Sequence, residues 1–269
     1  MNYAAVYCVA CFVLCAIGIV EWFGSRNVEC IGVGALNVAK ERLLWAFSIF
    51  LSITLFVPIL LKTLLEHLFG NQSIGAPIID LISTCVSLLA SLVFACRIYG
   101  ALRIRNCKKN WLTLLGEGAC GFGVALPVVL LVSWLWLALL IALNKFGFNV
   151  ALQEQGPVVL FGKLSGFLPK FLFSLAAVAV APVAEELIFR GGLYRVFKSH
   201  LTRGSSAILT SIIFAALHFS LVALLPLFTL SIFLIKGYDR SGNIFAPIIM
   251  HAIFNCNSLV LMALFHPQV

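Results

Sequence analysis

The sequence predicts an all-α protein, a polytopic transmembrane bundle of about eight helices. Of its 269 residues 62% are apolar and only 10% are charged, whereas a soluble domain carries about 25% charged residues. Apolar runs long enough to cross a bilayer recur along the chain, and short loops between them hold most of the charge. The net charge of +8 therefore reports membrane orientation, and we expect no nucleic-acid partner.

Eight apolar segments follow one another and define the expected spans. They cover residues 3–20, 43–61, 76–96, 120–143, 168–189, 206–219, 222–235 and 244–265. The first segment lacks the basic start of a secretory signal, so we interpret it as a membrane helix. Pro127 predicts a kink in the fourth segment. The sixth and seventh are short, and only Ser220 and Leu221 separate them.

The basic residues between the spans predict the topology. One set of alternate loops contains Arg26, Lys40, Arg42, Arg97, Arg103, Arg105, Lys108, Lys109, Arg195, Lys198, Arg203, Lys236 and Arg240; the opposite set contains Lys62, Lys145, Lys163 and Lys170. Basic loops stay in the cytosol. We therefore expect an integral membrane protein with both termini outside the cytosol, in the inner membrane if the source is prokaryotic.

The chain divides into two predicted parts. Residues 1–165 form N-terminal helices with connecting loops, and residues 166–265 form the core that carries the candidate site. The loop 144–166 is unusually apolar, so it either dips into the membrane or covers the bundle. No internal repeat marks a further domain.

Charged residues inside the fifth span give the first functional signal. Glu185, Glu186 and Arg190 follow a long apolar run, and an ionisable group at that depth costs roughly 2.5–3.5 kcal/mol on insertion scales. Glu186 and Arg190 are spaced i,i+4 and can pair, which leaves Glu185 free. The alternative is a helix end at the cytosolic interface whose charges reach the headgroups.

Two further polar pairs lie in the sixth and eighth spans. Phe214 shares a helix face with His218, and His251 shares one with Asn255. At 1.5 Å per residue, both histidines and Glu185 lie at comparable depth, which predicts one shared site. Each also has a structural explanation: a hydrogen-bonded buried histidine, an asparagine that joins helices, and Pro182 as a simple bend.

This set of side chains suits attack of water on an amide. A carboxylate can act as a general base, and histidine and amide groups are donors for the oxyanion of a tetrahedral intermediate. Other protease signatures are missing: there is no HExxH motif, and Asp80 and Asp239 do not form a dyad.

These motifs resemble those of a known protease family. Glu185-Glu186 with Arg190, Phe214 with His218, and His251 with Asn255 are similar to the EExxxR, FxxxH and HxxxN motifs of the CAAX protease and bacteriocin-processing family, also called Abi, which includes the Ras-converting CAAX endopeptidase. The resemblance covers about residues 169–264 and places the motifs on core helices five, six and eight. It implies that Glu185 and His218 activate water, that His251 and Asn255 stabilise the oxyanion, and that Glu186, Arg190 and Phe214 support them.

Several alternatives remain open at this stage. We expect a glutamate-dependent mechanism without a cofactor; Glu185, His218 and His251 form the alternative, a zinc set of the metalloendopeptidase type. The expected substrate is a peptide or a lipidated protein C-terminus in contact with membrane lipid. The alternatives to an endopeptidase are a catalytically silent immunity or scaffold protein of the same fold, or a proton-coupled transporter. The sequence does not indicate an oligomeric state.

Overall fold

A computed structural model describes residues 7, 11–13, 15–20, 33–35, 40–69, 75–101 and 106–265, and all regular structure in these ranges is helical. Its elements are α2 (Lys40–Phe69), α3 (Ala76–Ala101), α4 (Trp111–Lys145), α5 (Gly156–Lys163), α6 (Phe167–Leu175), η1 (Ala176–Val180), α7 (Ala181–Glu186), η2 (Leu187–Tyr194), α8 (Arg195–Phe197), α9 (Arg203–Ala216), α10 (Leu221–Ser241) and α11 (Phe245–Phe265). The elements η1 and η2 are π-helical.

The helices are those of an integral membrane protein. Six helical stretches in the described residues are long and apolar enough to cross a bilayer: Trp45–Phe69, Ala76–Gly100, Trp111–Lys145, Phe167–Phe197, Leu221–Ser241 and Phe245–Leu264. Helix α9 is apolar but shorter, and so is the stretch Cys11–Val20. Much of the first predicted span, and the basic markers Arg26, Arg103 and Arg105, lie outside the described residues.

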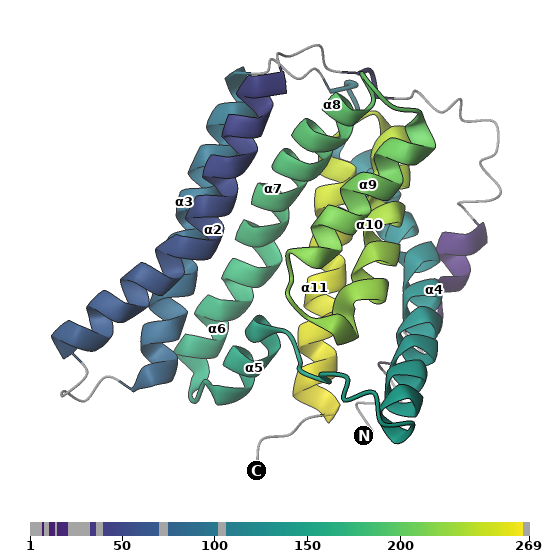
Figure 1. Ribbon diagram of the computed structural model, residues 1–269. Helices are drawn as coiled ribbons and strands as arrows, with labels where there is room; N and C mark the ends of the chain where they lie inside the picture. The colour runs from purple at the N-terminus through teal and green to yellow at the C-terminus, as the bar shows by residue number, and fades with distance from the viewer. Residues whose placement is uncertain are drawn as a thin grey trace.

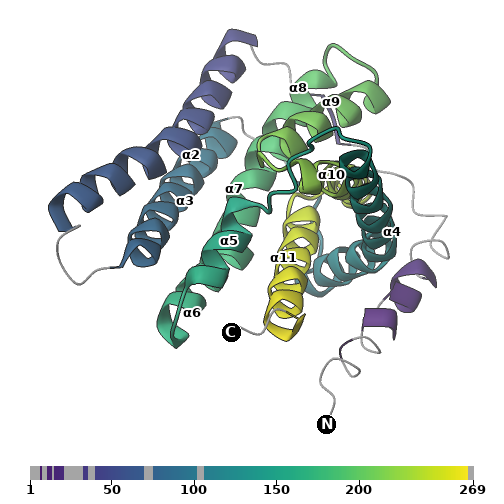
Figure 2. The same cartoon turned by 60° about the horizontal axis from the view of Figure 1, so that its bottom comes forward.

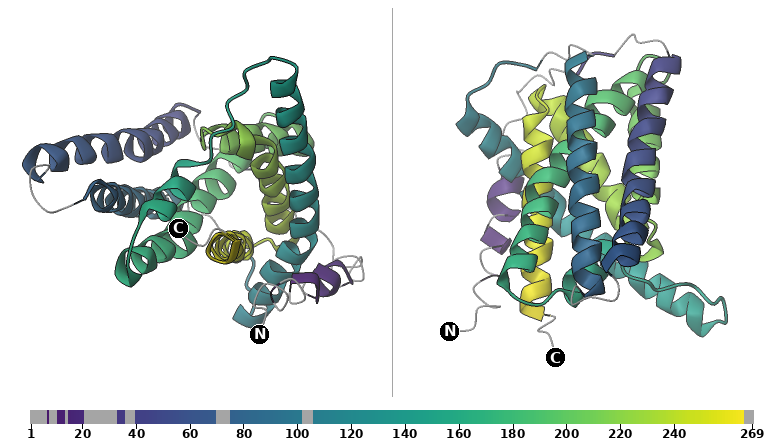
Figure 3. Two further views of the ribbon diagram at one scale, coloured as in Figure 1. Left: turned by 90° about the horizontal axis from the view of Figure 1, so that it is seen from below. Right: turned by 90° about the vertical axis from the view of Figure 1, so that its left-hand side faces the viewer.

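The bundle has three parts, which Figures 1 and 2 show from two directions. Helices α2 and α3 pack together as a pair on one side, and α4 lies on the opposite side against α10 and α11. The stretch from α6 to α8, together with α9, α10 and α11, occupies the middle. Seen along the bundle in Figure 3, α2 is the outermost helix, and it exposes large apolar side chains such as Trp45 and Phe56.

Helix α4 begins earlier than predicted, at Trp111 instead of residue 120. Asn110 caps its first turn by accepting a hydrogen bond from the Leu112 amide at 3.3 Å, as N-cap residues do. The glycine-rich start is helical because it packs closely: a Cβ added at Gly118 would come within 2.6 Å of the Ile249 side chain in α11. Glycine here permits close helix approach instead of breaking the helix.

The fifth span is longer than predicted, and its charges lie inside it. The helical stretch continues without a break from Phe167 to Phe197, and the side chains of Glu186 and Arg190 are completely buried. The interpretation of these charges as an interfacial helix end is therefore wrong. The two π-helical elements lie on either side of α7; π-helices are rare and are found frequently at functional sites.

Segments with basic residues contact one another at one end of the bundle. Asp239 in α10 is buried there, accepting hydrogen bonds at Oδ2 from the Tyr194 hydroxyl at 2.5 Å and from Arg203 Nε at 2.7 Å. Lys198 lies 3.6 Å from the other carboxylate oxygen. Across the same end, the Cys107 amide bonds to the Gly242 carbonyl at 3.0 Å.

The apolar loop 144–166 covers part of the bundle. It contains the short helix α5, whose Leu160 is buried together with the following Leu164. Both pack against Leu81 of α3 and Phe173 of α6. The ring of Phe173 also packs against that of Phe161 in a tilted arrangement, with ring centroids 5.5 Å apart. Of the two possibilities for this loop, packing over neighbouring helices is the one observed.

Candidate active site

A completely buried ion pair lies at the base of the site. Arg190 Nη1 donates to Glu186 Oε1 at 2.7 Å, and both side chains have no exposed surface. The predicted i,i+4 pairing is thus confirmed. Arg190 Nη2 donates to the Ser231 hydroxyl of α10 at 2.8 Å. Breaking such a pair by removing one partner costs about 3–5 kcal/mol, because the other charge is left uncompensated in a poor dielectric.

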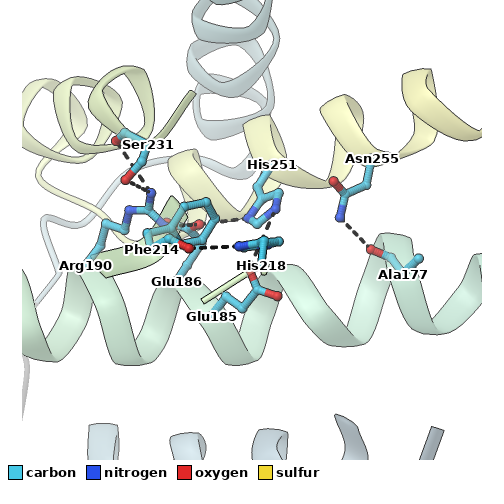
Figure 4. Close-up of polar contacts among 9 residues, drawn as sticks. All are labelled: Ala177, Glu185, Glu186, Arg190, Phe214, His218, Ser231, His251 and Asn255. Carbon is cyan, nitrogen blue, oxygen red and sulfur yellow. Dashed lines mark hydrogen bonds and ion pairs between the residues drawn. The ribbon is translucent and has the colours of Figure 1, made fainter. Parts of the chain in front are cut away.

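Glu186 also binds His251 directly, as Figure 4 shows. His251 Nδ1 lies 2.8 Å from Glu186 Oε1. Because a carboxylate held by a guanidinium accepts hydrogen bonds, Nδ1 carries the proton in this contact. The other ring nitrogen, Nε2, lies 4.0 Å from Glu185 Oε2. The two consecutive glutamates therefore face the two sides of one imidazole.

His218 lies in the turn after α9, not within a span as predicted. Its backbone amide bonds to the Ala215 carbonyl at 3.2 Å, because the helix tightens as it ends. The Phe214 carbonyl thereby loses its usual backbone donor, and His218 Nδ1 takes its place at 2.8 Å. A carbonyl only accepts, so Nδ1 carries the proton and Nε2 of the neutral ring retains a lone pair.

Phe214 connects the buried pair to both histidines. Its side chain is completely buried, and the Arg190 guanidinium lies over its ring at 4.6 Å. The same ring lies 4.9 Å from that of His218 and 6.0 Å from that of His251. On its other side Phe189 meets it edge to face at 5.2 Å. Phe214 thus fixes the positions of both imidazoles by packing.

Glu185 is the accessible carboxylate of the site. Its side chain is 22% exposed, whereas that of Glu186 is completely buried. Glu185 Oε2 is itself buried and has no hydrogen-bond partner among the described residues. In the view of Figure 4 the Glu185 side chain appears below those of His218 and His251. Glu185 comes from α7, His218 from the turn after α9, and His251 from α11. The three residues were expected to lie at a similar depth, and this similar depth accounts for their convergence.

Asn255 lies further along α11, away from this cluster (Figure 4). Its side-chain amide donates to the Ala177 carbonyl in η1 at 2.8 Å. The Ala181 amide donates a hydrogen bond to the Ala176 carbonyl, five residues back. In the same π-helical pattern, the amide of residue 182 would donate to the Ala177 carbonyl. Proline has no N–H to donate there. Asn255 therefore supplies the donor that Pro182 lacks, so this contact is the interhelical bond foreseen as an alternative.

Sequence reasoning missed two contacts in the site. The bond between Glu186 and His251 joins two helices that are far apart in the sequence. The contact of Arg190 with Ser231 depends on one small hydroxyl in an otherwise apolar segment of α10. Neither has a motif of its own; the only signal for Ser231 is a polar residue within an apolar span.

Glu185, His218 and His251 are the residues of the alternative zinc set. No group of three or more His, Cys, Asp or Glu side chains in the described ranges is placed to hold a metal ion. Both histidines bind protein acceptors through Nδ1, and such a hydrogen bond orients the other ring nitrogen, Nε2.

Comparison with known proteins locates the match in this same region. Residues 167–257 match the model of the Rce1-like family, described as type II CAAX prenyl endopeptidase Rce1-like. An Escherichia coli protein, described as an uncharacterized 24.3 kDa protein, is 31% identical over 90 residues, which is 31% of this chain and 42% of the relative. The chain thus spans less than half the length of that relative. No solved structure matches.

The matched segment contains every residue of the site, from Ala177 in η1 to Asn255 in α11. The match overlaps residues 169–264, over which the sequence resembles the CAAX protease and bacteriocin-processing family. Residues 167–257 are thus similar to the Rce1-like family of type II CAAX prenyl endopeptidases.

Proposed function

We propose that this protein is an intramembrane endopeptidase in which Glu185 and His218 activate a water molecule. The observation that carries the proposal is the arrangement around Glu185. The Glu185 side chain is partly exposed, and its Oε2 is buried without a hydrogen-bond partner among the described residues, 4.0 Å from His251 Nε2. The neighbouring Glu186 forms a completely buried ion pair with Arg190. A general base has to be accessible to water, and the 22% exposure of the Glu185 side chain supports this role.

The proposed reaction is hydrolysis of one peptide bond. Water bound between Glu185 and His218 Nε2 attacks the carbonyl carbon, and Glu185 takes the proton. His251, in its doubly protonated form, donates from Nε2 to the oxyanion, and Asn255 donates through the amide hydrogen that does not bind Ala177. The proton then passes to the leaving nitrogen, the carbon–nitrogen bond breaks, and an acid and an amine are released.

The proposed substrate is the C-terminus of a prenylated protein or peptide, as the family description suggests. An isoprenoid chain would bring this substrate into the bilayer, where the site lies. Peptides without a lipid remain the second substrate class within the same reaction.

Cleavage of defined peptides by the purified protein in lipid vesicles tests the proposal. The panel contains a peptide ending in prenylated Cys-aliphatic-aliphatic-X, the same peptide without the prenyl group, and an unrelated transmembrane peptide. We expect release of the three residues after the modified cysteine, detected by mass spectrometry. Cleavage of the unprenylated peptide at an equal rate would contradict the substrate class, and cleavage of none would contradict the activity.

A chelator provides a separate test of the glutamate-dependent mechanism. We expect a strong chelator to leave turnover of the prenylated peptide nearly unchanged, because the proposed reaction uses only side chains and water. Initial rates before and after dialysis against the chelator measure the effect. Complete inhibition that added zinc reverses would instead support a metal held by Glu185, His218 and His251.

A further inference from the structure

Among the described residues, Ser231 is the one side chain from another helix that is hydrogen-bonded to the Arg190 guanidinium. The guanidinium donates to Glu186 Oε1 within its own helical stretch, and across the helix interface it donates to Ser231 Oγ at 2.8 Å and to the Ser231 carbonyl at 3.5 Å. Its Nε has no partner among the described residues. Ser231 is therefore the contact that fixes the direction of the guanidinium relative to α10.

Ser231 is unusual in its position in α10. From residue 221 to residue 237, three side chains of this helix are polar. Thr229 bonds to its own helix, to the Leu225 carbonyl at 2.8 Å, on an exposed side, and Lys236 is also exposed. Of these three polar side chains, only Ser231 is completely buried. A buried hydroxyl among apolar side chains is unfavourable unless it is hydrogen-bonded, and its partner here is Arg190.

The Arg190 guanidinium links Ser231 to the two histidines through two sets of contacts. In one set, Arg190 holds Glu186 Oε1, which in turn holds His251 Nδ1. In the other, its planar group lies on Phe214, whose ring packs against His218 and His251. A small rotation of the guanidinium would therefore move the carboxylate and the aromatic ring that together set both imidazoles.

We propose that Ser231 is a positioning residue for the proposed peptidase reaction, which acts through Arg190 to hold His251 and its Nδ1–H bond to Glu186 in place. The inference rests on the proposed function for its effect on rate. Its effect on the His251 bond does not depend on activity, so each of the two can fail separately.

The test compares three variants of the full chain in lipid vesicles. Ser231→Ala removes the hydroxyl, Ser231→Thr retains it, and Thr229→Ala removes a neighbouring hydroxyl that does not contact Arg190. With the prenylated peptide, we expect Ser231→Ala to lower kcat roughly 10- to 100-fold with KM nearly unchanged, because the reacting groups are misplaced while binding is retained. Ser231→Thr should recover most of the loss, and Thr229→Ala should behave as the wild type.

A spectroscopic readout accompanies the kinetics. In protein labelled with heavy nitrogen at histidine, the His251 Nδ1–H resonance is assigned by its loss in His251→Gln. We expect Ser231→Ala to shift or broaden this resonance, and Ser231→Thr and Thr229→Ala to preserve it. If Ser231→Ala does not fold, Ser231→Cys replaces it, because sulfur is a weak acceptor of similar size, and a smaller change in the same direction is expected.

The outcomes separate the two proposals. An unchanged His251 resonance in Ser231→Ala would overturn the positioning role, even if the melting temperature fell, because the hydroxyl would then serve packing alone. A changed resonance with wild-type kcat would overturn it as well. If the wild-type protein cleaves no peptide, the proposed function fails, and the resonance alone then decides whether Ser231 positions His251.

Discussion

We expect Glu185→Gln to lower kcat about 10²–10⁴-fold, the usual effect of removing a general base, and to leave the melting temperature unchanged. Glutamine keeps the size of the side chain but does not take a proton from water. Folding should be unaffected because Glu185 Oε2 has no hydrogen-bond partner among the described residues and the side chain is partly exposed. Turnover of the prenylated peptide and thermal unfolding of the same preparation measure the two effects.

The adjacent residue provides the matched control. Glu186→Gln makes the same chemical change one position along the chain, but it leaves the Arg190 charge buried without its carboxylate. We therefore expect a clearly lower melting temperature from this variant, in addition to any loss of rate. Wild-type turnover in Glu185→Gln would remove Glu185 from the mechanism. An equal loss of stability in both variants would contradict the division of roles between the two glutamates.

We expect Asn255→Ala to show two separable losses. Loss of the bond to the Ala177 carbonyl should lower stability by about 0.6–2 kcal/mol, the range for hydrogen bonds between membrane helices. Loss of the proposed oxyanion donor should lower kcat roughly 10²–10³-fold with little change in KM. His251→Ala should give a similar loss of rate, and the double variant less than the sum, because both act on one oxygen.

Pro182 allows the two losses to be separated. In Pro182→Ala the backbone regains an N–H that can bond to the Ala177 carbonyl, so the stability cost of Asn255→Ala should shrink in this background while the loss of kcat remains. Asn257→Ala removes an amide from the same helix, outside the site, and should retain kcat. A lower melting temperature with normal kcat per folded molecule would assign Asn255 to the interhelical bond alone.

The sequence predicted the helical class, the membrane location and the convergence of three helices. Charged and polar residues are so unfavourable in a bilayer that Glu185, His218 and His251 stand out, and their distances from basic loops place them at one depth. The pairing of Glu186 with Arg190 also followed from spacing alone. The pairing and the shared depth could be predicted because each depends only on the number of residues along a single helix.

Contacts that depend on how helices face one another were not predictable in the same way. In a soluble helix, apolar periodicity distinguishes the buried face, but lipid-facing residues here are apolar too, as the exposed Trp45 and Phe56 of α2 show. The sequence therefore did not indicate that Glu186 meets His251 or that Arg190 meets Ser231. His218 was placed inside a helix because nothing in its apolar surroundings marks the end of α9 at Ala216.

Hydrolysis in water labelled with heavy oxygen tests the central claim most directly. Purified wild-type protein in lipid vesicles is incubated with the prenylated peptide in labelled water, and the products are weighed by mass spectrometry. Attack of water activated by Glu185 and His218 predicts that the new C-terminal carboxylate carries the label and that Glu185→Gln yields almost none of this product. An intact peptide after incubation with the wild-type protein, or equal labelled product from both proteins, would contradict the account.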